Sequence, residues 1–163
     1  MKAVVKPNAL AWLTLSLGII LADQIVKAIV LATLQPYQSH DVIPGLLSWT
    51  LAFNKGAAFS FLHDESGWQR WLFSLLAIFV SAALVRWLAT IRRSDWHNAL
   101  PLALVIGGAL GNLIDRVRFG QVTDFIDVYW GDAHFPAFNV ADSGITVGAV
   151  LLIWFGFFAS KKS

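Results

Sequence analysis

The fold is decided by one apolar stretch near the start of the chain, LAWLTLSLGIILADQIVKAIVLATL, residues 10–34. As an α-helix this stretch would be about 37 Å long, enough to cross the roughly 30 Å hydrocarbon core of a bilayer with some tilt. It is too long for the apolar core of a signal peptide, and no small-residue cleavage pattern follows it. The stretch therefore predicts a transmembrane helix.

Three more apolar stretches follow, and we expect further transmembrane helices at about residues 68–89, 97–115 and 142–159. Apolar residues make up 57% of the 163-residue chain and charged residues only 13%, whereas soluble domains carry roughly 25% charged residues. This composition, with a mean hydropathy of +0.64, excludes an ordinary soluble domain and a disordered chain. The sequence predicts a single all-α integral membrane domain, residues 1–163, with four transmembrane helices.

Lysine and arginine are distributed unevenly along this chain. The N-terminus, the turn between the second and third helices, and the C-terminus together hold seven cations and one acid. The connections 35–67 and 116–141, with the helix ends next to them, hold five cations and nine acids. The positive-inside rule therefore predicts cytoplasmic termini and two extracytoplasmic connections. Charges placed in this way form no basic face for nucleic acid, so we expect no nucleic-acid partner.

The two long connections have the patterns of folded segments. Residues 46–53 follow a Pro-Gly turn signal and are rich in apolar and aromatic side chains, which favours a strand. Residues 121–129 place three apolar side chains on one face of a second strand. We expect these strands to form a small extracytoplasmic β-sheet on the outer membrane face, with a short amphipathic helix at residues 56–62.

Glycines at helical spacing occur in both of the last two transmembrane stretches. Gly107 and Gly111 are four residues apart, as are Gly144 and Gly148. This small-xxx-small spacing lets transmembrane helices approach closely, although glycine is also simply common in such helices. We expect the third and fourth helices to be direct neighbours.

Two ionisable side chains lie within the first transmembrane stretch. Asp23 and Lys27 are four residues apart with the acid first, so they share a helix face and can form an ion pair. Ionisable groups in a membrane span mark a polar pair or a functional site. We expect a structural pair near the outer end of the helix rather than a catalytic role, although Lys27 could also extend to the membrane interface.

Polar residues gather where the third helix ends, in the strand after it, and where the fourth helix begins: Asn112, Asp115, Arg116, Asp124, Asp127, Asn139, Asp142 and Ser143. All should lie at about the same depth on the outer face. On a strand, Asp124 and Asp127 point to opposite sides, so at most one of them can meet Asp142. We favour Asp124, because it shares a strand face with apolar residues and is hard to explain as solvated surface.

Asp142 falls in or just before the first turn of the fourth helix, where a carboxylate is stabilised. A capping role alone would explain this residue, and Asn139 is a competing cap. Two carboxyl groups brought close together share one proton. One acid can then take a proton from water while the other polarises an amide carbonyl and protonates the leaving nitrogen. The acids at positions 124 and 142 are therefore our candidates for a catalytic pair.

Other hydrolytic chemistries fit this sequence less well. Because cysteine is absent, a thiol nucleophile, a thiolate metal centre and a disulfide are excluded. Ser143 has no evident histidine partner, and no Gly-x-Ser-x-Gly motif occurs. The four histidines show no metal-ligand spacing. A divalent metal held by two carboxylates stays possible, but we expect no metal and no cofactor.

Two other classes of protein would also place acids at helix ends. A small proton-coupled transporter is one, but it needs acids nearer the middle of the bilayer, where the last three helices have none. A non-enzymatic membrane assembly subunit is the other. Neutralising its acids would impair association or stability without a hydrolytic defect.

Five motifs together resemble the ordered motif series of bacterial lipoprotein signal peptidase, also called signal peptidase II. Each motif alone is weak, but five in this order and spacing are highly specific, and they extend from the first helix to the start of the fourth. They are DQIVK at 23–27, NKGAAF at 54–59, GGALGNLIDR at 107–116, VTDFID at 122–127 and FNVADS at 138–143.

The resemblance implies an inner-membrane aspartic endopeptidase with four helices and an active site near the periplasmic face. Such an enzyme cleaves prolipoprotein signal peptides before a diacylglyceryl-modified cysteine. Its catalytic acids would be Asp124 and Asp142. The resemblance also implies that membrane lipid and globomycin-type cyclic peptides bind the enzyme, and we expect a monomer. Residues implied to bind substrate are Asn54, Gly56, Asn112, Arg116 and Asn139.

Overall fold

The computed structural model of the protein describes residues 7–56 and 67–159. Its helices are η1 (Ala9–Trp12), α1 (Leu13–Thr33), α2 (Trp68–Thr90), α3 (Trp96–Phe119) and α4 (Val140–Ala159). In the described part of the chain, four helical segments are long and apolar enough to cross a membrane, which confirms the predicted fold class. The short helix expected at 56–62 falls, after Gly56, outside the described residues.

The helices differ from the predicted ones mainly at their ends. The first begins as a 3₁₀ turn, and α3 continues four residues beyond the predicted end at 115. It ends at Gly120, which has a φ of +75° and donates its backbone N–H to the Arg116 carbonyl oxygen. Glycine adopts this left-handed conformation without steric cost, so it terminates the helix here. The extra turn carries the chain from Arg116 into the following strand.

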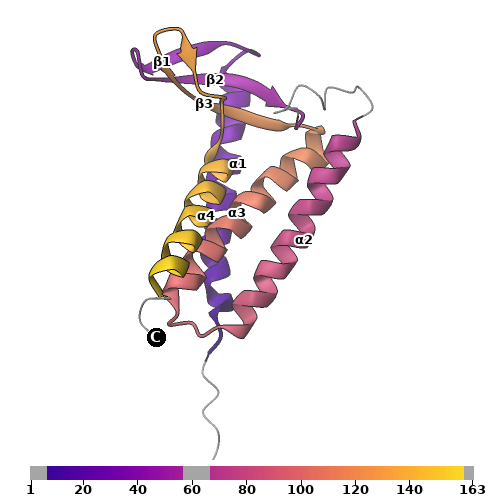
Figure 1. The fold of residues 1–163 in the computed structure, drawn as a ribbon. Coiled ribbons are helices and arrows are strands. Elements are labelled where there is room, and N and C mark those ends of the chain that lie inside the picture. Colours follow the sequence, from indigo (N-terminus) through magenta and orange to yellow (C-terminus); the bar gives the residue numbers. More distant parts are fainter. Residues whose placement is uncertain (1–6, 57–66, 160–163) are drawn as a thin grey trace, which may run out of the picture.

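A small antiparallel sheet lies across one end of the helix bundle (Figure 1). Its strands, in spatial order, are β1 (Ser39–Ile43), β2 (Leu47–Asn54), β3 (Val122–Trp130) and β4 (Ala133–His134). The strands predicted at 46–53 and 121–129 correspond to β2 and β3 and are confirmed. Because β2 and β3 are adjacent, the sheet joins the two long connections of the chain. We call this the sheet end; η1 and the α2–α3 turn lie at the opposite end of the bundle.

Helix α3 packs against each of the other three helices (Figure 1). Its contact with α4 is close: a Cβ atom added at Gly108 would lie 2.2 Å from the Ala141 carbonyl oxygen, and one at Gly148 would lie 2.8 Å from the Pro101 carbonyl oxygen. The expectation that the third and fourth helices are neighbours is therefore confirmed. The expected role of Gly107 in this contact is wrong, because its nearest neighbours are Ser16 and Ile19 of α1.

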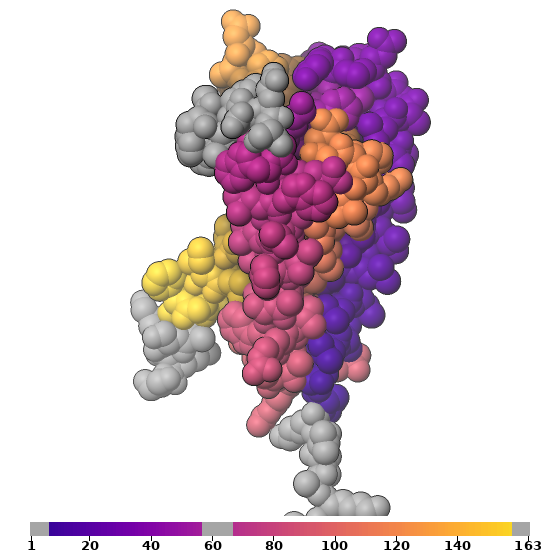
Figure 2. Space-filling model, turned by 90° about the vertical axis from the view of Figure 1, so that its right-hand side faces the viewer, coloured from indigo at the N-terminus to yellow at the C-terminus, as the bar shows by residue number. Residues whose placement is uncertain are grey.

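The outer faces of the helices are apolar and exposed, as expected of surfaces that face lipid. Figure 2 views the bundle from the α2 side, where Trp71, Leu75 and Phe79 are 62%, 52% and 70% exposed. The apolar core lies inside the opposite end of the bundle and consists of Ala9, Leu88, Ala99, Leu102 and Ile106. A smaller cluster of Val30, Leu51 and Phe125 joins α1 to the sheet.

Candidate active site

The N-terminus of α4 is closed by a reciprocal pair of capping hydrogen bonds. The Asn139 side-chain oxygen accepts from the Asp142 backbone N–H at 2.8 Å. The Asp142 Oδ2 atom in turn accepts from the Asn139 backbone N–H at 3.3 Å. This arrangement is a capping box, in which each side chain satisfies a backbone donor that the helix leaves free. The two residues therefore share the capping role, and Asp142 keeps its second oxygen for other partners.

The Asn139 side chain also reaches Asp124 on strand β3. Its Nδ2 atom donates to Asp124 Oδ1 at 2.7 Å and lies 3.2 Å from Asn112 Oδ1. Asn112 in turn donates from Nδ2 to Asp142 Oδ1 at 2.7 Å. Two buried asparagines thus hold the carboxyl groups of Asp124 and Asp142 in one hydrogen-bonded cluster. The structure brings these two acids together from strand β3 and helix α4.

Asp124 is only 3% exposed, and this environment changes its acidity. Burial, the largest cause, and the nearby negative charge of Asp142 together raise the pKa of Asp124 to about 7. Hydrogen bonds from Asn139 and Asn54 act in the opposite direction because they stabilise the ionised form. At neutral pH a large fraction of Asp124 therefore carries a proton.

Asp127 lies three residues further along β3 and has different partners. Its Oδ2 atom is 2.9 Å from His134 Nδ1 and accepts from Ser48 Oγ at 3.2 Å. These partners belong to the neighbouring strands β4 and β2. As the strand alternation predicts, Asp124 and Asp127 serve opposite faces of β3, and Asp124 is the acid that lies near Asp142.

Two of the remaining residues expected at the site, Arg116 and Gly56, lie against one aromatic ring, that of Phe73. The guanidinium carbon of Arg116 lies 5.3 Å from the centroid of Phe73. A Cβ atom added at Gly56, whose φ is +90°, would lie 2.5 Å from that ring. Asn54 accepts from the Gly56 backbone N–H at 2.8 Å. Phe73 therefore joins Gly56 to Arg116; sequence reasoning missed it because a phenylalanine in a lipid-facing helix carries no local signal.

Asp23 and Lys27 form the expected ion pair, with Lys27 Nζ 2.7 Å from Asp23 Oδ2. The alternative in which Lys27 extends to the membrane interface is wrong, because its side chain is 3% exposed. Its ammonium also pairs with Asp115 Oδ2 at 3.0 Å. Gln24 donates to Asp115 Oδ1 at 2.9 Å. Sequence reasoning did not connect Asp115 or Gln24 to this pair, since these contacts join helices far apart in the chain.

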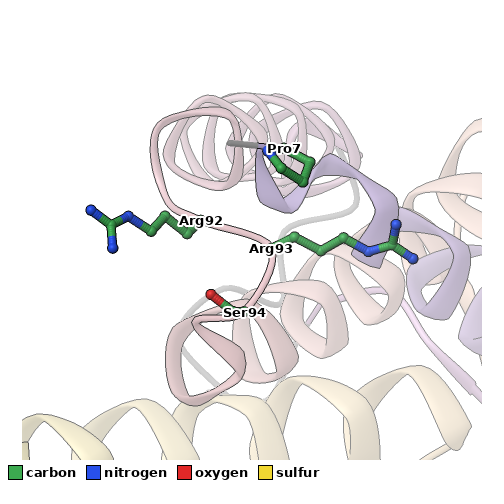
Figure 3. Close-up of a pocket in the computed structure, with 4 residues that line it drawn as sticks. All are labelled: Pro7, Arg92, Arg93 and Ser94. Carbon is green, nitrogen blue, oxygen red and sulfur yellow. The ribbon is translucent and has the colours of Figure 1, made fainter. Parts of the chain in front are cut away.

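A hollow lined by Pro7, Arg92, Arg93 and Ser94 lies at the opposite end of the bundle (Figure 3). The side chains of Arg92 and Arg93 point to opposite sides in this view, so they do not converge on a common ligand. The described part of the chain offers no comparable gathering of polar groups there. The candidate site is therefore the acid cluster at the sheet end.

Comparisons with known proteins show similarity along nearly the whole chain. A sequence model of the family described as signal peptidase (SPase) II matches residues 15–158. A lipoprotein signal peptidase of Pseudomonas aeruginosa is 57% identical over 155 residues, covering 94% of this chain and 91% of its own. One of Pseudomonas fluorescens is 56% identical and covers 96% of each chain.

The fold also matches solved structures. A bacterial membrane enzyme determined by the in meso method at 2.3 Å resolution superimposes with a TM-score of 0.81 and 32% identity, covering 97% of this chain and 94% of its own. A second such enzyme, at 1.9 Å resolution, gives a TM-score of 0.78 and 34% identity, covering 91% and 93%. The chain therefore belongs to the signal peptidase II family and is a membrane-spanning peptidase.

Proposed function

We propose that this peptidase is an aspartic endopeptidase that removes signal peptides from diacylglyceryl-modified prolipoproteins, with Asp124 and Asp142 as its catalytic residues. One observation carries the proposal: Asn139 hydrogen-bonds to both acids, through its side chain to Asp124 and through its backbone to Asp142. An asparagine in this position holds two carboxyl groups close together in a buried setting, where one of them retains a proton.

The environment of each acid suggests its role in the reaction. Asp142 lies in the first turn of α4, where backbone N–H groups and the helix dipole stabilise a negative charge. It therefore acts as the base and takes a proton from water, whose oxygen attacks the carbonyl carbon of the scissile amide. Asp124, with a pKa raised to about 7, is the protonated partner. It donates a hydrogen bond to the carbonyl oxygen in this step.

The second step breaks the carbon–nitrogen bond of the tetrahedral intermediate. The leaving nitrogen receives a proton from the acid pair, and the new carboxyl group remains on the released signal peptide. Water supplies the oxygen and the proton count balances, so the two acids return to their singly protonated state. This chemistry needs no group other than the two carboxyls and water.

The substrate would approach from the membrane, with its acyl chains remaining in the bilayer. Asn54, Gly56 and Arg116, grouped with Phe73, would contact the substrate beside the acids. Asn112 and Asn139 are 4% and 0% exposed, so they would orient the carboxyl groups from the inside. Globomycin-type cyclic peptides would compete for the same space.

The distribution of charge suggests how the chain sits in the membrane. Arg92 and Arg93 lie at the α2–α3 turn, at the end of the bundle opposite the acids. The positive-inside rule places that end and both termini in the cytoplasm. We propose a multi-pass protein of the bacterial inner membrane, active as a monomer, with Asp124 and Asp142 near the periplasmic face.

The test is to incubate the purified protein with a diacylglyceryl-modified precursor and to follow cleavage by mass spectrometry. Asp124→Asn and Asp142→Asn should each lower the cleavage rate by at least about 1,000-fold. Asp95→Asn is the control, because Asp95 lies at the far end of α3 and accepts from Asn98. The proposal is wrong if either variant at positions 124 or 142 retains the normal rate. A transporter or an assembly subunit would show no cleavage at all.

A further inference from the structure

Two buried acids outside the proposed catalytic pair bind the backbone immediately before each member of that pair. Asp115 Oδ2 accepts from the Thr123 backbone N–H at 3.0 Å, and Thr123 precedes Asp124. Asp23 Oδ1 accepts from the Ala141 backbone N–H at 2.9 Å, and Ala141 precedes Asp142. Each hydrogen bond fixes the main chain one residue away from a carboxyl group that must be positioned accurately.

Lys27 joins these two acids. Its ammonium lies 2.7 Å from Asp23 Oδ2 and 3.0 Å from Asp115 Oδ2. It also donates to Asn112 Oδ1 at 3.1 Å, and Asn112 donates to Asp142. Asp23, Lys27 and Asp115 are 0%, 2% and 1% exposed, so their charges are screened very little by solvent. The strand with Asp124 and the helix with Asp142 are thus both held to one ammonium group.

An ion pair that only stabilised α1 would not need these contacts. Asp23 and Lys27 already satisfy each other within one helix, yet Asp115 joins them from α3 and both acids use their oxygens on backbone donors of β3 and α4. Gln24 strengthens the same link, since its Nε2 atom donates to Asp23 Oδ2 at 3.2 Å and to Asp115 Oδ1 at 2.9 Å. Together these contacts join Asp23 and Asp115 to each other and to the backbone beside the acid pair.

We propose that Asp23, Lys27 and Asp115 form a positioning cluster that sets the separation of the Asp124 and Asp142 carboxyl groups. This inference rests on the proposed function, because it assigns the cluster to the chemistry of that acid pair. The three residues touch neither water nor substrate in the reaction. They act through the backbone of Thr123 and Ala141, and through Asn112.

Two double variants isolate the hydrogen bond to Thr123. Lys27→Met with Asp115→Asn, and Lys27→Met with Asp115→Ala, remove the same charges, one positive and one negative. The asparagine keeps an acceptor for the Thr123 N–H, and the alanine does not. We expect kcat to be lower by about tenfold or more in the alanine variant than in the asparagine variant, with KM nearly unchanged, because small misplacements of catalytic groups reduce rates strongly. Equal kcat values would overturn the proposal.

The same comparison can be made at the other end of the cluster if the alanine variant does not fold. Lys27→Met with Asp23→Asn, against Lys27→Met with Asp23→Ala, tests the hydrogen bond to Ala141 with the same expectation.

The pH profile of the folded Lys27→Met, Asp115→Asn variant, compared with that of Asp115→Asn alone, gives an independent measurement. Besides Lys27, the charged group that faces Asp124 most directly is Asp142, and Arg116 lies near both. Lys27 lowers the pKa of Asp124, so removing its charge raises that pKa. The alkaline limb of the cleavage rate should therefore move to higher pH. An unmoved limb would contradict the proposal.

These outcomes are separable from failure of the proposed function. If Asp124→Asn and Asp142→Asn abolish cleavage while the paired double variants cleave equally fast, only the positioning role is wrong. If the single variants cleave normally, the acid pair itself is wrong.

Discussion

The two ends of the helix bundle differ in the kind of side chain that packs inside them. At the end away from the sheet, α2, α3 and η1 pack through Ala9, Leu88, Ala99 and Leu102, all fully buried and apolar. At the sheet end, beside the small apolar cluster of Val30, Leu51 and Phe125, many buried side chains are charged or polar: Asp23, Lys27, Asn112, Asp115, Asp124 and Asn139.

This difference indicates that the sheet end is the functional end of the bundle. Buried polar groups are costly in a membrane protein unless each is paired. The core cluster of the apolar end shows that these helices pack closely without buried charges. The polar contacts at the sheet end therefore need a reason besides stability, and we attribute them to the acid pair that they surround.

Of the substitutions that compare the two ends, Asn139→Ala should cause the largest loss of cleavage rate. This change removes the donor to Asp124 and the cap of α4, so we expect the cleavage rate to fall by about 100-fold or more and the free energy of unfolding to fall by about 1 kcal/mol. Asn98→Ala is the matched control, since Asn98 hydrogen-bonds to Asp95 at the other end of α3. Cleavage assays and thermal unfolding check both variants. Similar cleavage rates for Asn139→Ala and Asn98→Ala would show that the polar contacts at the sheet end have no special role in catalysis.

A smaller effect should follow from Gly108→Ala. The new Cβ atom would meet the Ala141 carbonyl oxygen and Ile145, so α4 must shift and carry Asp142 with it. We expect a rate loss of about tenfold, together with a loss of about 1–3 kcal/mol in stability. Gly18→Ala is the control, because nothing lies within 4 Å of its added Cβ atom. If both substitutions are silent, close packing of α3 on α4 does not position the acid.

The smallest effect should come from Asp127→Asn. Asp127 hydrogen-bonds within the sheet to Ser48 and His134, so its loss should weaken the sheet but change the cleavage rate by only about threefold. The matched change is Asp124→Asn, three residues earlier in the same strand. A rate as low in Asp127→Asn as in Asp124→Asn would show that the two faces of β3 are not functionally distinct.

The sequence predicted the elements that carry strong local signals. Residues 46–53 and 121–129 were identifiable as strands because apolar side chains, strand periodicity and a turn signal coincide there. β1 was not predicted, since all five of its residues are exposed and Ser39, His40 and Asp41 are polar. It is an edge strand whose structure comes from pairing with β2 rather than from its own composition.

The site was also predictable only where a local sequence pattern indicated it. Strand alternation distinguished Asp124 from Asp127, and helix spacing paired Asp23 with Lys27. The role of Asp115 was not predictable, because its contacts with Lys27 and Thr123 depend on how α1, α3 and β3 pack. Glycine spacing predicted the α3–α4 contact, but it could not show that Gly108 rather than Gly107 faces α4.

The central claim is that Asp124 and Asp142 share one proton and act together on water. Carbon-13 NMR of aspartate carboxyl groups, with Asp124→Asn to assign the resonance, tests it most directly. We expect Asp124 to titrate near pH 7, and at lower pH in Asp142→Asn, because removing a neighbouring negative charge lowers its pKa. Cleavage should fall as the pH rises through the same value, since ionised Asp124 can no longer donate. Titration near the ordinary value of 3.8 in both proteins would contradict the claim.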